Sequence, residues 1–381
     1  MRVIFTTWAW PSHLYAMVPL AWALRAAGHE VLVATQPELL ETVRHTGLPA
    51  AAVGRDVDAP AAFHDIAFPS SAPPGEGARG GPRVVGLFAA IAEAMAPELV
   101  ALGRGWRADL IVSESTCLAG PVAAAALGVP HVRHLFGTDL LGNAAPFLHQ
   151  ALGPLCDRLG LPGVDLAGVA TVDPWPSGLQ VPAPSRRIPL RYVPFNGPGR
   201  LPRPLPGGGG SGLPRVCVTW GTTPARVDKR LFLAGRVARA LAGRARVVLA
   251  VTAEQRSLLG ELPPDAHVVE SVPLHLLLPR CEAVVCHGGA GTVLTALAQG
   301  LPLLLIPCLP DHVRHSAAVA GAGAGVALPA GTGDPELIAA ALPDVLACGA
   351  AADGLRAELA ARPSPAAVAR ELETLVQLAD R

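Results

Sequence analysis

The sequence predicts two α/β domains, each built on a parallel sheet with helices on both faces, joined by one linker. Strand-length apolar runs alternate with helix-like segments through both halves of the chain, which is typical of doubly wound sheets. Residues 195–214 are dense in proline and glycine and interrupt this alternation once, as a linker would. The chain has 381 residues, 51% of them hydrophobic, which is enough for two cores.

The first half opens with strand–helix–strand alternation. Apolar runs at residues 2–7, 31–35 and 109–114 predict buried strands, each followed by a helix-like segment. A further strand-like run lies at residues 130–136. Residues 69–82 combine proline, glycine and serine without an apolar period, so we expect a mobile insertion there.

The same alternation restarts after the linker. The predicted strands of the second half are residues 215–220, 246–252, 267–272, 283–287 and 301–307. The chain closes with an amphipathic segment that has an N-cap signal at Ser364. The predicted divisions are a domain at 1–200, a linker at 201–214, a domain at 215–362, and a helix at 363–381 that crosses back to the first domain. Open parallel sheets bind ligands at the carboxyl ends of their strands, so we expect both sheets to face one interdomain cleft.

Charge and composition exclude several classes of partner. Lys+Arg and Asp+Glu number 30 each, so no basic bias indicates nucleic acid or an anionic membrane. Lys229 is the only lysine, which excludes a P-loop with its G-K-[ST] signature. The seven cysteines form no C-x-x-C pair, so we expect a reduced, cytoplasmic protein. The apolar stretch at 14–24 is too short to span a bilayer and is broken by Pro19, so no membrane insertion is expected.

The stretch Cys-His-Gly-Gly-Ala-Gly-Thr, residues 286–292, lies between an apolar run and a helix-like segment. Glycines at a helix N-terminus expose backbone N–H groups to an anion, and His287 adds a side-chain donor, so the pattern favours diphosphate binding. It fails the dinucleotide pattern G-x-G-x-x-G because Leu294 stands where the third glycine belongs. The alternative interpretation is a tight turn that packs a helix on a strand.

Longer stretches resemble a known family. The run CHGGAGTVLTALAQGLPLLLIPCLPDH, with GAGAGVAL downstream, resembles the donor signature of family 1 nucleotide-sugar glycosyltransferases with the GT-B fold. The stretches SHLYAMVPLAWALRAAGHEV, AGPVAAAALGVPHVRHLFGTD and VPFNGPG are similar to the same group. The resemblance covers essentially the whole chain. It is closest to bacterial enzymes that attach deoxysugars to polyketides and other natural products.

The resemblance implies a donor site in the second domain. The implied donor-binding residues are Gly221, Thr222, Val272, His287, Gly289, Ala290, Gly291, Thr292, Asp311 and His312. Val272 would meet the base through its backbone, and Asp311 would hold sugar hydroxyls. The family commonly has glutamine after that acid, whereas this chain has His312, which leaves the sugar undetermined.

His13 is the candidate general base. It stands where a helix begins, and the positive end of the helix dipole would keep its imidazole neutral, as a base requires near pH 7. The resemblance implies the same role, with Glu114 as the orienting acid where aspartate is more common. A capping or buried polar histidine is the alternative. The residues expected to contact the acceptor are Trp8, Trp10, Tyr15, Phe88, Phe136 and Asp139.

Three further patterns are discounted. Asp56-Val57-Asp58 spells the D-x-D metal motif of another glycosyltransferase class, but it lies in a polar loop, so a solvated turn is the better interpretation. His-Val-Arg-His occurs at 131–134 and 312–315 without a third ligand, and no metal is expected at either. The GAGAG run at 321–325 follows a helix and reads as C-cap and turn.

The sequence thus predicts an inverting glycosyltransferase that moves a (deoxy)sugar from a dTDP- or UDP-sugar to a small hydrophobic aglycone, without a metal or another cofactor. The aglycone is expected partly under the loop at 55–90. Two alternatives stay open: a sugar-nucleotide epimerase of the same fold, and a non-catalytic helper or binding subunit. A homodimer and a separate activator protein are both compatible with the sequence.

Overall fold

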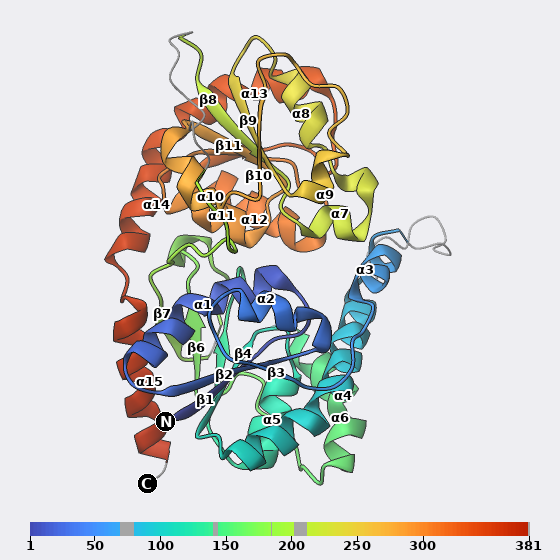
Figure 1. Ribbon diagram of the computed structural model, residues 1–381, viewed down its shortest axis with the longest axis vertical. Helices are drawn as coiled ribbons and strands as arrows, with labels where there is room; N and C mark the ends of the chain where they lie inside the picture. The colour runs from blue at the N-terminus through green and yellow to red at the C-terminus, as the bar shows by residue number, and fades with distance from the viewer. Residues whose placement is uncertain (69–79, 140–143, 184, 202–211, 380–381) are drawn as a thin grey trace. The chain divides into compact units, whose positions relative to one another are not determined.

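The computed structural model describes residues 1–68, 80–139, 144–183, 185–201 and 212–379, and the chain forms two compact units (Figure 1). Unit 1 comprises Met1–Pro174, Val181–Arg191 and Arg362–Arg381, and unit 2 comprises Trp175–Gln180 and Tyr192–Ala361. Most of the expected insertion at 69–82 and of the linker at 201–214 lies outside the described residues.

Unit 1 is built on seven parallel strands in the order β3-β2-β1-β4-β5-β6-β7. Their bounds are β1 Arg2–Thr6, β2 Glu30–Thr35, β3 Ala50–Ala52, β4 Leu110–Glu114, β5 His131–His134, β6 Ala170–Asp173 and β7 Arg187–Pro189. The central strands are apolar runs because helices cover both faces of the sheet, and all five residues of β4 are buried. The strand order reverses between β1 and β4, and this position is called the switch point.

The helices of unit 1 pack on this sheet. They are α1 Pro11–Ala26, α2 Leu40–Arg44, α3 Ala59–Ala67, α4 Gly80–Trp106, α5 Ala119–Leu127, α6 Ala145–Arg158 and α15 Pro365–Ala379, with 3₁₀ helices at Pro37–Leu39 and, within unit 2, at Ser177–Leu179. Residues 80–82, expected in a loop, instead open α4, because Pro82 occupies its first turn, where backbone N–H groups need no helical partner. Within the described residues, Gly81–Trp106 has the length and hydropathy of a membrane span, as does α13 with α14 if that bent pair is taken as one. In the structure α4 packs against α5 and α6, with Ile91, Met95 and Leu99 fully buried.

Unit 2 repeats the same plan with six parallel strands in the order β10-β9-β8-β11-β12-β13, and its switch point lies between β8 and β11. The strands are β8 Arg215–Thr219, β9 Arg246–Val251, β10 His267–Glu270, β11 Ala283–Cys286, β12 Leu303–Leu305 and β13 Gly325–Ala327. The helices are α7 Thr223–Val227, α8 Ala234–Ala240, α9 Ala253–Arg256, α10 Leu274–Leu277, α11 Ala290–Leu297, α12 Pro310–Gly321, α13 Pro335–Ala347 and α14 Gly349–Ala361, with 3₁₀ helices at Lys229–Leu231 and Leu278–Arg280.

The division of the chain differs in detail from the boundaries drawn on the sequence. Residues 192–201 belong to unit 2 rather than to the first domain, because Tyr192 and Asn196 hydrogen-bond to Thr295. The last helix, α15, packs against α1 within unit 1. His29 Nε2 lies 2.6 Å from Glu373 Oε1 and ties that helix to the N-terminal part of the chain.

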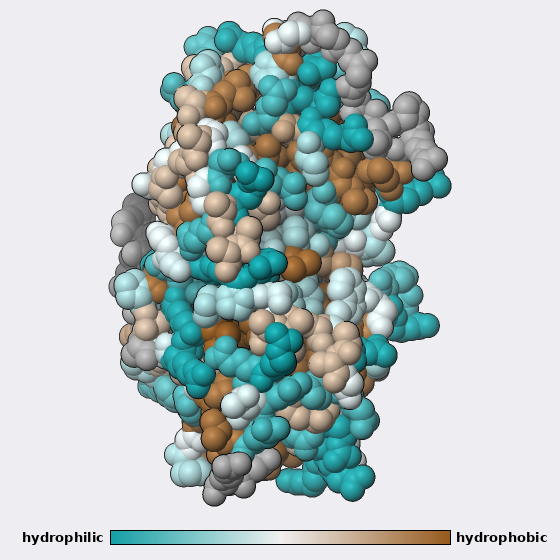
Figure 2. All heavy atoms as spheres, turned by 90° about the vertical axis from the view of Figure 1, so that its left-hand side faces the viewer, coloured by the Kyte–Doolittle hydropathy of each residue, from teal (hydrophilic) through white to brown (hydrophobic). Residues whose placement is uncertain are grey.

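Hydrophilic and hydrophobic residues are interspersed on the face shown in Figure 2. Among the described residues the most exposed large hydrophobic side chains are Phe147 and Leu378, at 64% and 59%. Single exposed side chains of this kind are normal for protein surfaces and indicate no particular partner.

Candidate active site

The candidate residues lie at the switch points of the two sheets. In unit 1, β1 leads to His13 and the adjacent β4 ends at Glu114. In unit 2, β8 leads to Gly221 and the adjacent β11 leads to His287. Loops at a switch point diverge to opposite faces of a sheet and leave space for a ligand between them. Each unit therefore carries one polar site at the position that its strand order prescribes.

His13 and Glu114 form a close pair in unit 1. His13 is in the first turn of α1, where Pro11 fixes the entry of the chain into the helix. Its Nδ1 lies 3.2 Å from Glu114 Oε2, although the alignment falls short of hydrogen-bond geometry. Such pairs often tighten only when substrate binds. The His13 side chain is 11% exposed, whereas that of Glu114 is fully buried.

Glu114 is held by neighbouring donors. Thr116 donates its backbone N–H to Oε1 at 2.7 Å and its hydroxyl to Oε2 at 2.7 Å, and the Ser115 hydroxyl donates to Oε1 at 3.0 Å. Burial alone raises the pKa of the Glu114 carboxyl, but the attraction of His13 and the hydrogen bonds from Thr116 outweigh it, so the pKa is lowered. Glu114 is thus an ionised carboxylate fixed beside an imidazole.

Aromatic rings hold the His13 imidazole in place. Phe136 stacks on it with ring centroids 3.9 Å apart, and Trp8 meets it edge-on at 5.2 Å. Trp8 Nε1 in turn donates to Thr116 Oγ1 at 2.8 Å, which connects the aromatic ring to the hydrogen-bond partners of Glu114. Trp8 therefore contacts His13 and also a hydrogen-bond donor of Glu114, and so helps to hold both side chains in place.

The other residues expected to contact an acceptor have different environments in the structure. Trp10 and Phe88 are core residues of unit 1 at 3% and 5% exposure. Asp139 is buried and accepts hydrogen bonds from Arg133 at 2.6 and 3.1 Å and from Arg187 at 3.3 Å, so its charge is already used within the protein. Tyr15 is half-buried, and burial raises the pKa of its phenol.

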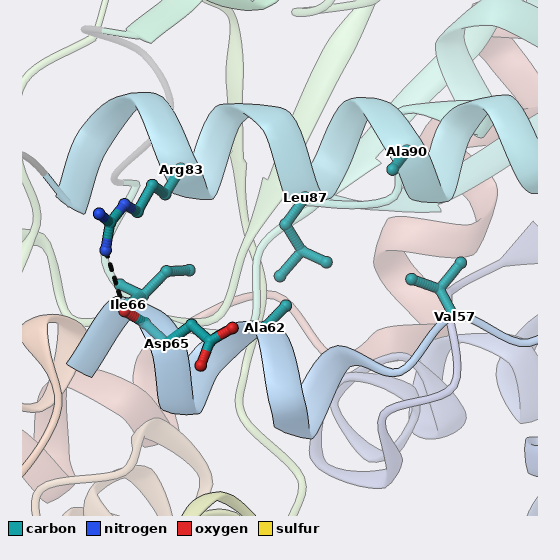
Figure 3. A pocket seen from close by; sticks show the side chains of 7 residues that line it. All are labelled: Val57, Ala62, Asp65, Ile66, Arg83, Leu87 and Ala90. Atoms are coloured by element: carbon teal, nitrogen blue, oxygen red, sulfur yellow. Dashed lines mark hydrogen bonds between the residues drawn. The ribbon is translucent and has the colours of Figure 1, made fainter. Parts of the chain in front are cut away.

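An apolar cavity of about 530 Å³ lies between α3 and α4 (Figure 3). Its lining residues are Val57, Ala62, Asp65, Ile66, Arg83, Leu87 and Ala90. Arg83 donates to the backbone oxygen of Asp65 at 3.1 Å. Phe63 and Phe88, the chain neighbours of two lining residues, contact Trp8 with centroids 6.2 and 6.4 Å apart. Phe63 and Phe88 thus connect the two helices that line the cavity to Trp8, which contacts His13. Sequence reasoning missed the part played by Phe63, which lies in a helix with no motif.

The glycines after β11 have three different environments. Gly288 has φ +84°, a conformation that favours glycine, and a Cβ there would lie 2.6 Å from Ser316 Oγ. A Cβ on Gly289 would lie 2.3 Å from Nε2 of His287. A Cβ on Gly291 would meet no protein atom within 4 Å. Packing a helix on a strand accounts for the first two glycines but leaves the third unexplained.

The His287 ring lies near Trp220, Gly221 and His312. It is 3% exposed, His312 meets it edge-on with centroids 4.6 Å apart, and Gly221, at φ +54°, has no room for a Cβ beside it. Burial first, and then His312 and His315, hold the pKa of His287 well below its usual value. Its Nδ1 is buried and has no hydrogen-bond partner among the described residues. A neutral imidazole with an unsatisfied nitrogen thus flanks the glycine turn.

The loop after β8 has a support that sequence reasoning missed. Gln255 donates its side-chain amide to the backbone oxygen of Gly221. Gln255 is itself oriented by a capping box with Thr252 at the start of α9. The pattern Thr-x-x-Gln at residues 252–255 could have predicted this capping box from the sequence. Thr222 is exposed at the end of this loop.

The remaining donor-side candidates occupy distinct positions. Thr292 and Ala290 are in the first turn of α11 and 7% exposed, and Val272 is half-buried before α10. Asp311, in the first turn of α12, keeps 33% of its side-chain surface exposed. His312 is only 2% exposed, and its Nδ1 lies 3.5 Å from Cys308 Sγ. His312 therefore contacts His287 rather than open space.

The discounted motifs have structural roles. Asp58 caps α3 by accepting from Ala61 N at 3.0 Å, and Asp56 accepts from Glu38 N at 3.0 Å. Helix α12 ends at Gly321, and Gly323 has φ +70° in the turn that follows. In the part of the chain that the structure describes, no three or more His, Cys, Asp or Glu residues are arranged to hold a metal ion.

Solved structures that match this chain include glycosyltransferases. The spinosyn rhamnosyltransferase SpnG matches with a TM-score of 0.85 and 34% identity over 98% of this chain and 100% of that one. SpnG has also been solved with thymidine diphosphate and with the spinosyn aglycone. The glycosyltransferase VinC, solved with dTDP, matches with a TM-score of 0.80 and 33% identity over the whole of both chains. The protein is thus a glycosyltransferase with the GT-B fold.

Sequence comparison narrows the class to a family. Residues 22–221 match the N-terminal domain and residues 237–375 the C-terminal domain of the family described as erythromycin biosynthesis protein CIII-like. The L-demethylnoviosyl transferase of Streptomyces niveus is 38% identical over 98% of this chain and 97% of that protein. The tylactone mycaminosyltransferase of Streptomyces fradiae is 36% identical over 99% and 93%. The chain belongs to the erythromycin biosynthesis protein CIII-like family, whose relatives here are named as transferases, so the epimerase and helper-subunit interpretations are not favoured.

Proposed function

We propose that this glycosyltransferase moves a deoxysugar from a dTDP-sugar to a hydroxyl of a hydrophobic aglycone, with inversion at the anomeric carbon and with His13 as general base. The observation that carries the proposal is the His13–Glu114 pair, 3.2 Å apart at the switch point of unit 1. A donor with dTDP is supported by the nucleotides in the solved structures of SpnG and VinC. UDP-sugars are the second donor class to test.

The proton chemistry follows from the two ring nitrogens. Nδ1 of His13 faces an ionised carboxylate, so the neutral tautomer with the proton on Nδ1 is favoured and Nε2 is left to accept a proton. The acceptor hydroxyl gives its proton to Nε2 as its oxygen forms the bond to the anomeric carbon. The bond from that carbon to the diphosphate oxygen breaks on the opposite side, which inverts the configuration. Glu114 then stabilises the imidazolium.

The leaving diphosphate is assigned to the turn after β11. Backbone N–H groups of residues 289–292 at the start of α11 and the neutral His287 imidazole would meet its growing charge. The open space beside Gly291 supports this assignment, because nothing in the protein requires a glycine there.

The aglycone is assigned to the cavity between α3 and α4. Its volume of about 530 Å³ and largely apolar lining suit a small hydrophobic molecule, and the aromatic contacts of Trp8 connect its two helices to His13. The acceptor would then contact residues 57–66 and 83–90, which lie within the region at 55–90 expected from the sequence.

The deciding experiment incubates the full chain with dTDP-deoxysugars and a panel of polycyclic and macrocyclic alcohols, and follows release of dTDP. An inverted anomeric configuration by NMR supports the proposal, and a retained configuration overturns the single-displacement mechanism. Conversion of a dTDP-sugar without an acceptor would indicate an epimerase. The proposed reaction needs no divalent ion, so activity lost with EDTA and restored by Mg²⁺ would contradict it.

The diphosphate assignment has its own test. His287→Ala removes a donor from the turn, and we expect the Kd for dTDP to rise about tenfold, the loss of roughly one hydrogen bond to a charged group. Calorimetry with dTDP measures this on the free enzyme. Unchanged affinity would reject the role of His287.

A further inference from the structure

One segment of the chain hydrogen-bonds to two separate parts of the proposed donor site. This tether segment, residues 192–199, precedes the predicted linker and packs within unit 2. The side-chain amide of Asn196 makes both connections. Its Nδ2 donates to Thr295 Oγ1 at 3.0 Å, and its Oδ1 accepts from the backbone N–H of His275 at 3.2 Å and lies 3.1 Å from His275 Nδ1.

The first connection ends on the diphosphate turn. The Thr295 hydroxyl donates to the backbone oxygen of Gly291 at 2.6 Å and accepts from Asn196 at 3.0 Å. The Tyr192 hydroxyl lies 3.1 Å from the Thr295 hydroxyl and donates to the same Gly291 oxygen at 3.3 Å. Burial raises the pKa of Tyr192 to about 12, so its phenol remains protonated. These contacts hold α11 at its first turn.

The second connection ends on the segment assigned to the nucleoside. His275 is the second residue of α10, a helix that has no side-chain N-cap of its own, so Asn196 supplies the acceptor that its N–H group needs. The tether segment also packs closely here, because a Cβ on Gly199 would lie 2.4 Å from Pro273 Cδ and 2.6 Å from Ser271 O.

Ser271 shows why this support is needed. Its φ of +50° is a left-handed conformation that residues other than glycine adopt at a cost. Its N–H donates to Val251 O at 2.9 Å on one side, and Gly199 packs on its carbonyl oxygen on the other. Val272, whose backbone is assigned to the base, follows Ser271 directly, so the contacts that fix Ser271 also restrict the backbone of Val272.

We propose that Asn196 is a positioning residue for the nucleotide, fixing the separation between the nucleoside segment, residues 271–275, and the diphosphate turn, residues 287–292. The inference rests on the proposed function, since the diphosphate turn is assigned to the donor there, and on the base contact that the resemblance implies for Val272. α10 and α11 are neighbours in unit 2 (Figure 1), and a ligand that spans them binds more tightly when their spacing is set in advance. Asn196 does so with one planar amide, without touching the ligand.

The test measures dTDP binding to the full chain by calorimetry. Asn196→Ala removes both connections, and we expect the Kd for dTDP to rise about tenfold. Thr295→Val keeps the shape of the side chain but removes its hydroxyl, and we expect a similar loss. Val193→Ala, an exposed position on the same segment, is the matched control and should bind like wild type.

Kinetics separate positioning from a general loss of structure. Asn196→Ala should raise KM for the dTDP-sugar and leave KM for the aglycone unchanged, because every contact of Asn196 lies in unit 2. Thermal melting checks that each variant folds. If Asn196→Ala does not fold, the dTDP affinity of Thr295→Val tests the positioning role in its place. Wild-type affinity in both variants overturns the positioning role and leaves the proposed function standing. Failure of the wild-type chain to bind dTDP or UDP overturns both.

Discussion

Each unit places a histidine at the switch point of its sheet, His13 after β1 and His287 after β11, and the two histidines have different neighbours. In unit 1, His13 faces the buried carboxylate of Glu114, which would stabilise a positive charge on the imidazole. In unit 2, burial and two further histidines, His312 and His315, disfavour a positive charge on His287. One sheet plan thus supports a proton acceptor in one unit and a neutral hydrogen-bond donor in the other. The neighbours, rather than the fold, distinguish the two roles.

The largest expected effect tests the proton-transfer side of this comparison. His13→Ala should lower kcat by about 10²–10⁴-fold, the usual contribution of a general base, while the Kd for dTDP stays unchanged. Steady-state kinetics and calorimetry measure the two quantities. The matched control is His45→Ala, an exposed histidine beside Glu41, which should leave kcat intact. A variant that keeps more than about a tenth of wild-type kcat would show that His13 is not the base.

A smaller loss is expected when the charge beside His13 is removed. Glu114→Gln replaces the carboxylate with a neutral amide and should lower kcat about 10- to 100-fold, the range for losing a hydrogen bond to a charged group. KM for both substrates should change little, since Glu114 is fully buried and acts through His13. Glu41→Gln, an exposed pair member, serves as control. If Glu114→Gln keeps wild-type kcat, the carboxylate beside His13 is not what distinguishes the role of His13 from that of His287.

A third change probes the empty space at the turn in unit 2. Gly291→Ala adds a methyl group where the protein has no atom within 4 Å, so the free energy of unfolding should rise by up to about 1 kcal/mol through better helix propensity. The methyl group should obstruct the diphosphate and raise the Kd for dTDP at least about tenfold. Denaturant melts and calorimetry give both values.

Gly354→Ala is the matched control for that change. Gly354 lies within α14, and a Cβ there also meets no atom within 4 Å. This variant should gain stability without any change in dTDP affinity. If Gly291→Ala behaves in the same way, the diphosphate does not approach that position.

The smallest expected effect is on acid stability. Burial lowers the pKa of His312 and His315, as it lowers those of His131 to about 3 and His134 to about 4. Below the usual histidine pKa the unfolded chain takes up protons that these residues do not, so stability is complete above about pH 6.5 and falls as the pH decreases.

His312→Gln removes one such group from unit 2. At pH 5 wild type loses stability because the unfolded chain protonates this histidine more readily than the folded protein does, and the variant avoids that loss, so its Tm should fall less between pH 7 and pH 5. Differential scanning calorimetry checks this, with the exposed His267→Gln as control. An equal fall in Tm for wild type and His312→Gln would contradict a low pKa for His312.

Much of the framework could be predicted because parallel strands buried on both faces are continuous apolar runs. The predicted runs correspond to β1, β2, β4, β5 and β8 to β12 within a residue or a few at each end. The strands that were missed, β3, β6, β7 and β13, have three or four residues each and lack a long apolar run. The position of a short strand is determined by packing against neighbouring strands and helices more than by its own composition.

The residues of the candidate site also divide into those that the sequence could predict and those that it could not. The glycine turn and His13 carry local patterns, so their sequence context was sufficient to single them out. Asn196 and Phe63 act through partners far away in the chain, and Asn196 meets Thr295 99 residues later. Asp139 looked available from sequence, but Arg133 on β5 and Arg187 on the more distant β7 already donate to it. Long-range pairing is what a single sequence leaves undetermined.

The contact between α1 and α15 bears on how the chain folds as it is made. His29 and Glu373 are 344 residues apart, so unit 1 cannot complete its packing until the ribosome has delivered almost the entire chain. Unit 2 is synthesised later, yet its residues up to Ala361 are available first as a complete set. The unit that begins first therefore closes last, because α1 has to wait for α15 to pack against it.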